Sequence, residues 1–154
     1  GTPVNKIAAK IQSGSNFDDL MLFLENLVKN PSKTAVARLY DFLKANDIEL
    51  SDDGHFYAWK RVRGDFKDIY SGKFDNSPGK IVQMHRSQVD TDDERTCSNG
   101  LHVCSISYLD YYGTSESNKT VKVKVNPADV VSIPVDYDNA KMRVCRYEVL
   151  EEVQ

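Results

Sequence analysis

The spacing of apolar residues changes near the first third of the chain, and this change constrains the fold more than any other feature. Before residue 51 the apolar positions recur at helical intervals, and after Gly54 they alternate as they do in β-strands. The turn-forming segment 51–54 separates the two regions. We therefore predict an α+β fold, with short N-terminal helices packed on a mostly antiparallel, twisted β-sheet. Residues 1–50 are expected to form a helical subdomain and residues 51–154 the sheet, together one compact unit.

Three helices are predicted before residue 51, and each is too short to be stable unless it buries its apolar side. The first covers residues 4–11. The second begins at Asn16, whose side chain can cap a helix, and the third follows Asn30, with Pro31 at its first position. The apolar positions are Val4, Ile7, Ala8 and Ile11 in the first helix, Phe17, Leu20, Met21, Leu24, Leu27 and Val28 in the second, and Val36, Leu39, Tyr40 and Leu43 in the third.

The strands are predicted from alternation of apolar and polar residues. The clearest is 121–125, whose three valines face one way while Lys122 and Lys124 face the other. The segment 142–150 loses its alternation near Cys145, which indicates a bulge or burial on both faces. The other predicted strands are 55–62, 68–71, 81–84, 101–104 and 130–135, with a type II turn at 77–80, a turn at Asn99-Gly100 and a short helix at 105–112.

The charge balance argues against binding to nucleic acid or an anionic membrane through bulk electrostatics. The 154 residues carry 20 basic and 23 acidic side chains, a net charge of −3. The acidic run at residues 90–94 is interpreted as a solvated loop. No apolar run approaches the roughly 20 residues that span a bilayer. The chain does not begin with methionine, and we expect it to be part of a longer protein.

Cysteine and histidine are the residues most suggestive of chemistry. Cys97, His102, Cys104 and Cys145 have the ligand types of a zinc site, but they lack the paired spacing of such sites. Cys97 or Cys104 activated by a histidine is a second interpretation. Buried, reduced, metal-free thiols are the favoured one, because free cysteine is often buried and the cytosol keeps thiols reduced. We predict no metal, no cofactor and no catalytic residue, since no known catalytic motif is present.

The segment 55–63 combines aromatic and cationic residues. Such a segment can bind single-stranded nucleic acid, with bases stacked on the aromatic rings. The alternative is a central strand that turns either Phe56 and Ala58 or Tyr57 and Trp59 into the core. The net charge favours the strand, and we predict no nucleic-acid binding by this chain.

A binding surface is predicted on the loop at residues 74–79 and the strands beside it, because binding residues concentrate on loops mounted on a sheet. The alternative is that Asp75 and Asn76 only satisfy the backbone of a turn. The residues placed on this surface are Trp59, Asp75, Asn76, Ser77, Arg86 and His102.

Long segments of the chain, in order, match one known family. They are 23–27 (FLENL), 37–43 (ARLYDFL), 56–60 (FYAWK), 74–80 (FDNSPGK), 96–105 (TCSNGLHVCS) and 130–137 (VVSIPVDY). On these motifs the chain resembles the C-terminal part of the rapid-lysis B (rIIB) proteins of T-even-like phages.

This resemblance implies an early phage protein of the infected bacterium that acts in lysis inhibition and in escape from exclusion by a resident prophage. It implies association with the rapid-lysis protein A, possible contacts with host or prophage exclusion proteins, and indirect, peripheral attachment to the inner membrane from the host cytoplasm. The family supplies no catalytic residues, and any DNA-binding module lies outside this segment. We therefore expect a non-enzymatic interaction domain.

The alternative function is a nucleotide or small-molecule binding domain. The order of a 101–104 strand, a short helix and a 121–125 strand is similar to that in ADP-ribosyltransferase-like proteins, which would make this a degenerate pocket of that type. The residues corresponding to their site are His55 or His102, Tyr57 and Glu148. Likeness of fold does not by itself establish activity.

Overall fold

The computed structural model describes residues 17–45, 48–92, 94–95, 98–106, 117–134 and 141–153. Within these ranges the chain forms two α-helices and a seven-stranded sheet whose strand pairs are all antiparallel, which confirms the α+β prediction. The helix predicted at 4–11 lies outside the described residues, as does most of the one predicted at 105–112.

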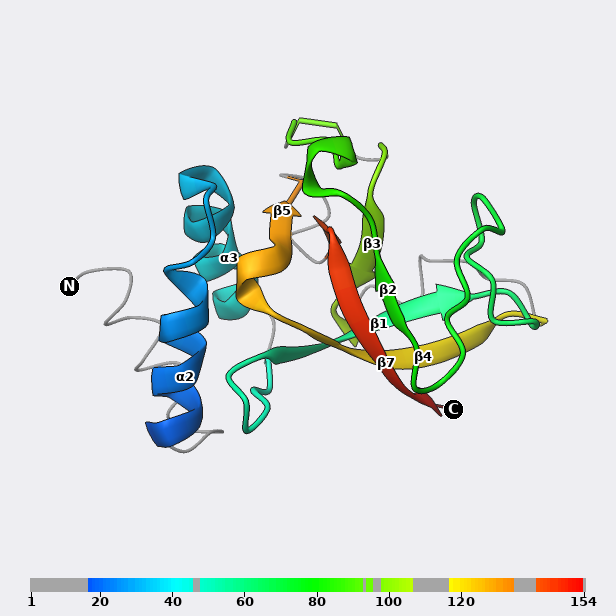
Figure 1. The fold of residues 1–154 in the computed structure, drawn as a ribbon, viewed down its shortest axis with the longest axis horizontal. Helices are drawn as coiled ribbons and strands as arrows, with labels where there is room; N and C mark the ends of the chain where they lie inside the picture. The colour runs from blue at the N-terminus through cyan, green and yellow to red at the C-terminus, as the bar shows by residue number, and fades with distance from the viewer. Residues whose placement is uncertain are drawn as a thin grey trace.

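The sheet is strongly twisted, and its strand order is β2-β7-β4-β1-β3-β6-β5 (Figure 1). The strands are β1 (Phe56–Val62), β2 (Ile81–Gln83), β3 (Leu101–Cys104), β4 (Lys119–Val125), β5 (Val130–Ser132), β6 (Lys141–Val144) and β7 (Arg146–Val153). Short 3-10 helices lie at η1 (Arg86–Gln88) and η3 (Pro127–Asp129).

Helices α2 (Phe17–Leu27) and α3 (Lys33–Ala45) cover the β5 end of the sheet (Figure 1). The rings of Phe23 and Phe42 each pack on Phe56 of β1, with centroids 6.5 and 6.4 Å apart. Because aromatic side chains bury large apolar areas, this contact is a main source of the stability that holds the helices on the sheet.

The predicted apolar face of α2 is only half buried. Leu20 and Leu27 are in the core with Phe23, whereas Phe17, Met21 and Val28 are exposed. The prediction that all six apolar positions pack inward was wrong. In α3, Leu39 is buried as predicted, and Ala35 and Phe42 are buried with it.

The start of α3 also differs from the prediction. The helix begins at Lys33 rather than at Pro31, because Ser32 caps it by accepting a hydrogen bond from the Ala35 backbone N–H, 3.1 Å away. The Asn30 amide group contacts the sheet region instead of capping the helix. Its amide nitrogen donates to the carbonyls of Pro127 and Val130, 2.9 and 2.8 Å away, and so ties the helices to the sheet.

Most predicted strands are confirmed, and two need correction. Residues 68–71 form no strand, because the carboxylate of Asp68 folds the chain back by accepting hydrogen bonds from the backbone N–H groups of Ser71 and Phe74. The segment 142–150 is divided at Cys145 into β6 and β7. The type II turn is confirmed by the φ of +90° at Gly79 and the hydrogen bond from Lys80 N–H to the Ser77 carbonyl.

Candidate functional site

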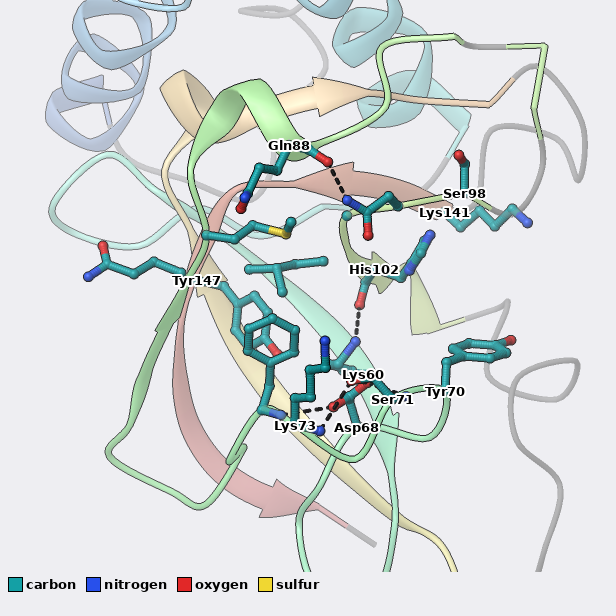
Figure 2. A pocket seen from close by; sticks show the side chains of 16 residues that line it. Lys60, Asp68, Tyr70, Ser71, Lys73, Gln88, Ser98, His102, Lys141 and Tyr147 are labelled. Carbon is teal, nitrogen blue, oxygen red and sulfur yellow. Dashed lines mark hydrogen bonds between the residues drawn. The ribbon is translucent and has the colours of Figure 1, made fainter.

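The sheet opens between β1 and β3. These strands are in register at Trp59 and Cys104 alone in the described part of the chain, whereas β1 pairs with β4 along its whole length. Lys60 follows Trp59, and its Nζ donates a 2.7 Å hydrogen bond to the His102 carbonyl across the opening (Figure 2). A side chain thus joins two strands whose backbones have separated.

A cavity of about 660 Å³ lies at this opening. Lys60 and Tyr147 form its base, and the loop between β1 and β2 contributes one wall (Figure 2). The residues that line it are Lys60, Asp68, Tyr70, Ser71, Lys73, Phe74, Gln83, Met84, Gln88, Ser98, Asn99, Gly100, Leu101, His102, Lys141 and Tyr147.

Lys60 is a buried cation, only 4% exposed. Burial lowers its pKa to about 8, against the opposing attraction of Asp68, because desolvation penalises the charged ammonium. Its Nζ also lies 5.8 Å from the centroid of the Tyr147 ring. The tyrosine is buried as well, which raises its pKa, and its hydroxyl donates to Asn76 Oδ1.

Asp68 supports the wall of the cavity. Its carboxylate accepts hydrogen bonds from the backbone and hydroxyl of Ser71, at 2.8 and 2.6 Å, and from the backbone of Phe74, at 2.9 Å. Burial acts to raise the pKa of Asp68, but these hydrogen bonds outweigh it and the net change is downward. The carboxylate is therefore ionised at neutral pH.

His102 is neutral in this environment. Burial lowers its pKa to about 3, and the positive charges of Lys60, Arg143 and Lys141 act in the same direction. Its ring packs edge-on against Tyr70, with centroids 6.3 Å apart. Its Nε2 is buried and has no hydrogen-bond partner among the described residues, a costly state for a polar atom.

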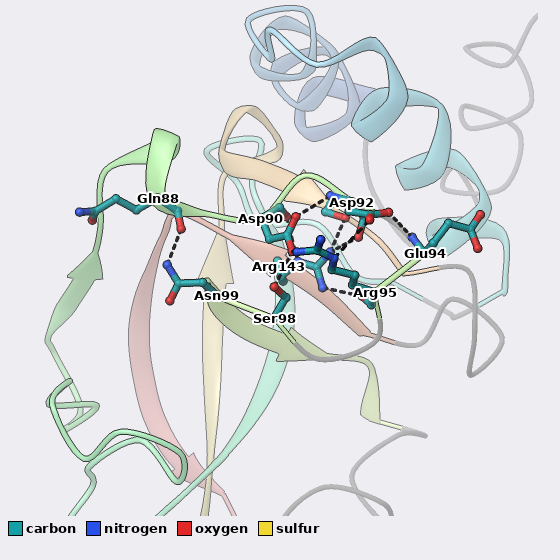
Figure 3. Close-up of polar contacts among 9 residues, drawn as sticks. Gln88, Asp90, Asp92, Glu94, Arg95, Ser98, Asn99 and Arg143 are labelled. Carbon is teal, nitrogen blue, oxygen red and sulfur yellow. Dashed lines mark hydrogen bonds and ion pairs between the residues drawn. The ribbon is translucent and has the colours of Figure 1, made fainter.

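A buried arginine holds chain segments next to Gln88 and Ser98, two residues that line the cavity. Arg143 of β6 donates from its guanidinium to the carbonyls of Asp90, Asp92 and Arg95, at 2.9, 2.5 and 2.8 Å (Figure 3). It also donates to Ser132 Oγ at 3.0 Å. The acidic segment is exposed at Asp92, as expected for a solvated loop. The sequence does not indicate the attachment of this segment to Arg143, because every residue has a backbone carbonyl and only the fold decides which ones a side chain binds.

The six residues of the predicted surface do not all meet at the cavity. His102 lines it, whereas Trp59 lies on the other face of β1 from Lys60. Arg86 points toward the helices, where it donates to Asn30 Oδ1 and to the carbonyls of Ala128 and Val130.

The remaining three lie in the turn before β2. Asp75 Oδ1 accepts from the backbone N–H of Ser77, 3.0 Å away, as in an ordinary Asx turn. Asn76 is fully buried and accepts from the hydroxyl of Tyr147. A binding role for the six residues remains a prediction.

The residues corresponding to a transferase site are divided between two places. Tyr57 and Glu148 both lie beside Lys124, which pairs with Tyr57 in β1 and with Glu148 in β7. His55 lies next to the same lysine through Asp53. These residues do not line the cavity, whereas His102 does.

The cysteines that the structure describes are structural in character. Cys104 and Cys145 are free and buried, as predicted, and Cys97 lies outside the described residues. Burial raises the pKa of Cys104 to about 12, so its thiol is protonated at neutral pH. Among the described residues no three His, Cys, Asp or Glu side chains are grouped to hold a metal ion.

Lys60 lines the cavity but is not among the six predicted site residues. The signal was present: strand alternation places Lys60 on the same face as Phe56, Ala58 and Val62, all of which are buried. A lysine in an otherwise apolar core row is rare unless it is paired or functional.

Comparison with known proteins identifies relatives over the whole chain. The family described as "Bacteriophage T4 protein rIIB" matches residues 2–154. Protein rIIB of Enterobacteria phage T4 is 58% identical over 150 residues, which cover 97% of this chain and 48% of the relative. The chain therefore spans about half the length of that curated relative. No solved structure matches the chain.

Proposed function

Because the chain belongs to the bacteriophage T4 rIIB protein family, we propose that it is a regulatory interaction domain without catalytic activity of its own. The proposed role is in lysis inhibition and in escape from prophage exclusion, in the host cytoplasm and together with the rapid-lysis protein A. The family match along residues 2–154 carries this proposal. Host or prophage exclusion proteins are further candidate partners.

An exposed apolar row on α2 supports a docking role. Phe17 and Met21 on α2, and Val28 directly after its last residue, continue the same helical spacing and are 63%, 42% and 81% exposed. Large apolar side chains grouped on one exposed helix face are typical of protein interaction sites. We assign this docking row (Phe17, Met21 and Val28) to contact with protein A.

The protonation states of the described cysteine and histidine side chains near β3 support a non-enzymatic role. A nucleophilic cysteine requires a thiolate, and the raised pKa of Cys104 keeps the thiol protonated. A general base requires a pKa near the working pH, and that of His102 is lowered far below it.

Capture on tagged protein A tests the docking row, using a full-length rIIB-family protein. The double substitution Met21→Lys and Val28→Lys is expected to abolish capture while leaving the melting temperature unchanged, because both side chains are exposed. Ile81→Lys is the matched control, since Ile81 is 52% exposed on β2, away from the helices. Undiminished capture of the double variant contradicts the docking row, and failure to capture the unsubstituted protein contradicts the partnership.

Membrane association is proposed to be indirect, through protein A. None of the helices in the described residues is long and apolar enough to cross a membrane. Flotation of the chain with anionic liposomes tests this point. We expect the chain to float only when protein A is present, and strong flotation of the chain alone contradicts the indirect attachment.

A further inference from the structure

The charges at the cavity favour a negatively charged ligand. Lys60 lies at its base and Lys73 at its exposed edge, while Asp68 is the only acidic residue among the described residues that line it. The oxygens of Asp68 already accept three hydrogen bonds from Ser71 and Phe74. The acid is therefore held in the wall, and the lysines are the charges presented to a ligand.

The walls of the cavity suit a ligand with an apolar ring, because the aromatic side chains of Phe74 and Tyr147 are among the residues that line it. Phe74, Met84, Leu101 and the Tyr147 ring supply apolar surface around the Lys60 ammonium. Its volume of about 660 Å³ is within the range of small-molecule sites, roughly 300–1,000 Å³. Apolar walls also strengthen the attraction between a buried cation and an anion, because the local dielectric constant is low.

His102 supplies a specific polar position. The neutral ring forms a hydrogen bond with the backbone of Ser98, and Nε2 is left buried with no partner in the described part of the chain. We assign Nε2 as the unprotonated nitrogen, which makes it an acceptor. A ligand that offers a hydroxyl or amino group would satisfy this atom.

We propose that this cavity binds a small molecule in which an anionic group is joined to a planar ring bearing a hydroxyl or amino donor. The anionic group lies at Lys60 and Lys73, the ring lies between the apolar walls, and the donor meets His102. A nucleoside monophosphate and a hydroxylated aromatic carboxylate both have this chemistry. The site is separate from the docking row on α2 and does not depend on it.

Pairs of anionic and neutral probes test the proposal by amide NMR spectra of the chain. The phosphate pair is AMP and adenosine, and the carboxylate pair is 4-hydroxyphenylacetate and its amide. In at least one pair the anionic member is expected to bind about tenfold more tightly than the neutral one and to shift the resonances of Lys60, His102 and Tyr147. The pair that shows this preference identifies phosphate or carboxylate as the anionic group.

Substitutions identify which residue causes the preference for the anionic probe. Lys60→Met is expected to remove the preference for the anionic member, while Lys29→Met, at an exposed position outside the cavity, is expected to preserve it. If Lys60→Met does not fold, Lys73→Met and a rise in NaCl from about 20 to about 300 mM replace it, and each is expected to weaken the anion several-fold. Equal affinities within both pairs, no binding at about 10 mM probe, or a preference that these changes leave undiminished overturns the proposal.

Discussion

The buried ammonium of Lys60 makes the folding stability depend on pH in an alkaline window. Burial lowers its pKa from 10.5 to about 8 in the folded protein. Between these values the unfolded chain retains a proton that the folded protein has released, so the free energy of unfolding rises with pH. Below pH 8 Lys60 is protonated in both the folded and the unfolded state, and the folded protein bears the full cost of burying the charge. Above pH 10.5 this cost is absent.

The size of this dependence follows from the change in pKa. A shift from 10.5 to about 8 corresponds to about 3 kcal/mol of stability, of which about 2.5 kcal/mol is gained between pH 7 and pH 10. The substitution Lys60→Met removes the titrating group. It also leaves the His102 carbonyl without its donor, but this loss is the same at every pH and does not alter the slope.

Urea unfolding of both proteins at pH 7, 8, 9 and 10, followed by circular dichroism, measures the effect. The quantity compared is the difference between the two free energies of unfolding at each pH, because this difference cancels titrations common to both. Cys104 and Tyr147 are such groups, since burial raises their pKa values and alkaline pH therefore destabilises both proteins. We expect the difference to move in favour of the unsubstituted protein by about 2.5 kcal/mol from pH 7 to pH 10. A difference that stays constant within about 0.5 kcal/mol refutes the assignment of Lys60 as a buried, destabilised cation.

Three further predictions concern the region around the cavity. Arg143→Met is expected to lower stability by about 3–5 kcal/mol in urea unfolding, because the loop carbonyls at 90–95 lose their charged donor; a loss below about 1 kcal/mol contradicts this. Gly100→Ala is expected to cost about 1–3 kcal/mol in the same assay, since its φ is +148° and a Cβ would lie 2.8 Å from Val89 Cγ1; unchanged stability contradicts the strain. Cys104 is expected to resist iodoacetamide at pH 8 in the folded protein and to react in urea, because its pKa is raised to about 12; mass spectrometry of the peptide reads this out, and rapid labelling of the folded protein contradicts it.

Much of the fold was accessible from the sequence because apolar alternation directly reports burial. The valines at 121, 123 and 125 are all buried, and Lys122 and Lys124 lie on the other face, as predicted. The strand and helix predictions were wrong where hydrogen bonds from a nearby side chain set the backbone conformation against the pattern of apolar residues. Asp68 makes a turn from residues that alternate like a strand, and Ser32 takes the capping position that the Asn30-Pro31 pair suggested.

Much less of the candidate site could be predicted from the sequence. Its opening depends on β1 and β3 separating after a single pair at Trp59 and Cys104, and strand pairing is not encoded by either strand alone. The sequence around Asn76 is typical of a turn. In the structure its side chain is buried and accepts a hydrogen bond from Tyr147. Only contacts between segments distant in sequence distinguish these roles.

Long polar side chains are placed where the sheet is irregular, and this placement links the fold to the cavity. Lys60 bridges the opening between β1 and β3, and Arg143 holds the loop that crosses above β6. Arg86 and Asn30 together satisfy the carbonyls beside η3, where the helices meet the sheet. An apolar side chain at any of these positions would leave buried carbonyls without donors, so the irregular backbone and its polar partners have to be retained together. Of these polar residues Lys60 alone also lines the cavity within the described ranges, so its substitution separates a purely structural bridge from a ligand contact. A structural bridge changes stability only, whereas a ligand contact also changes the preference between charged and neutral probes.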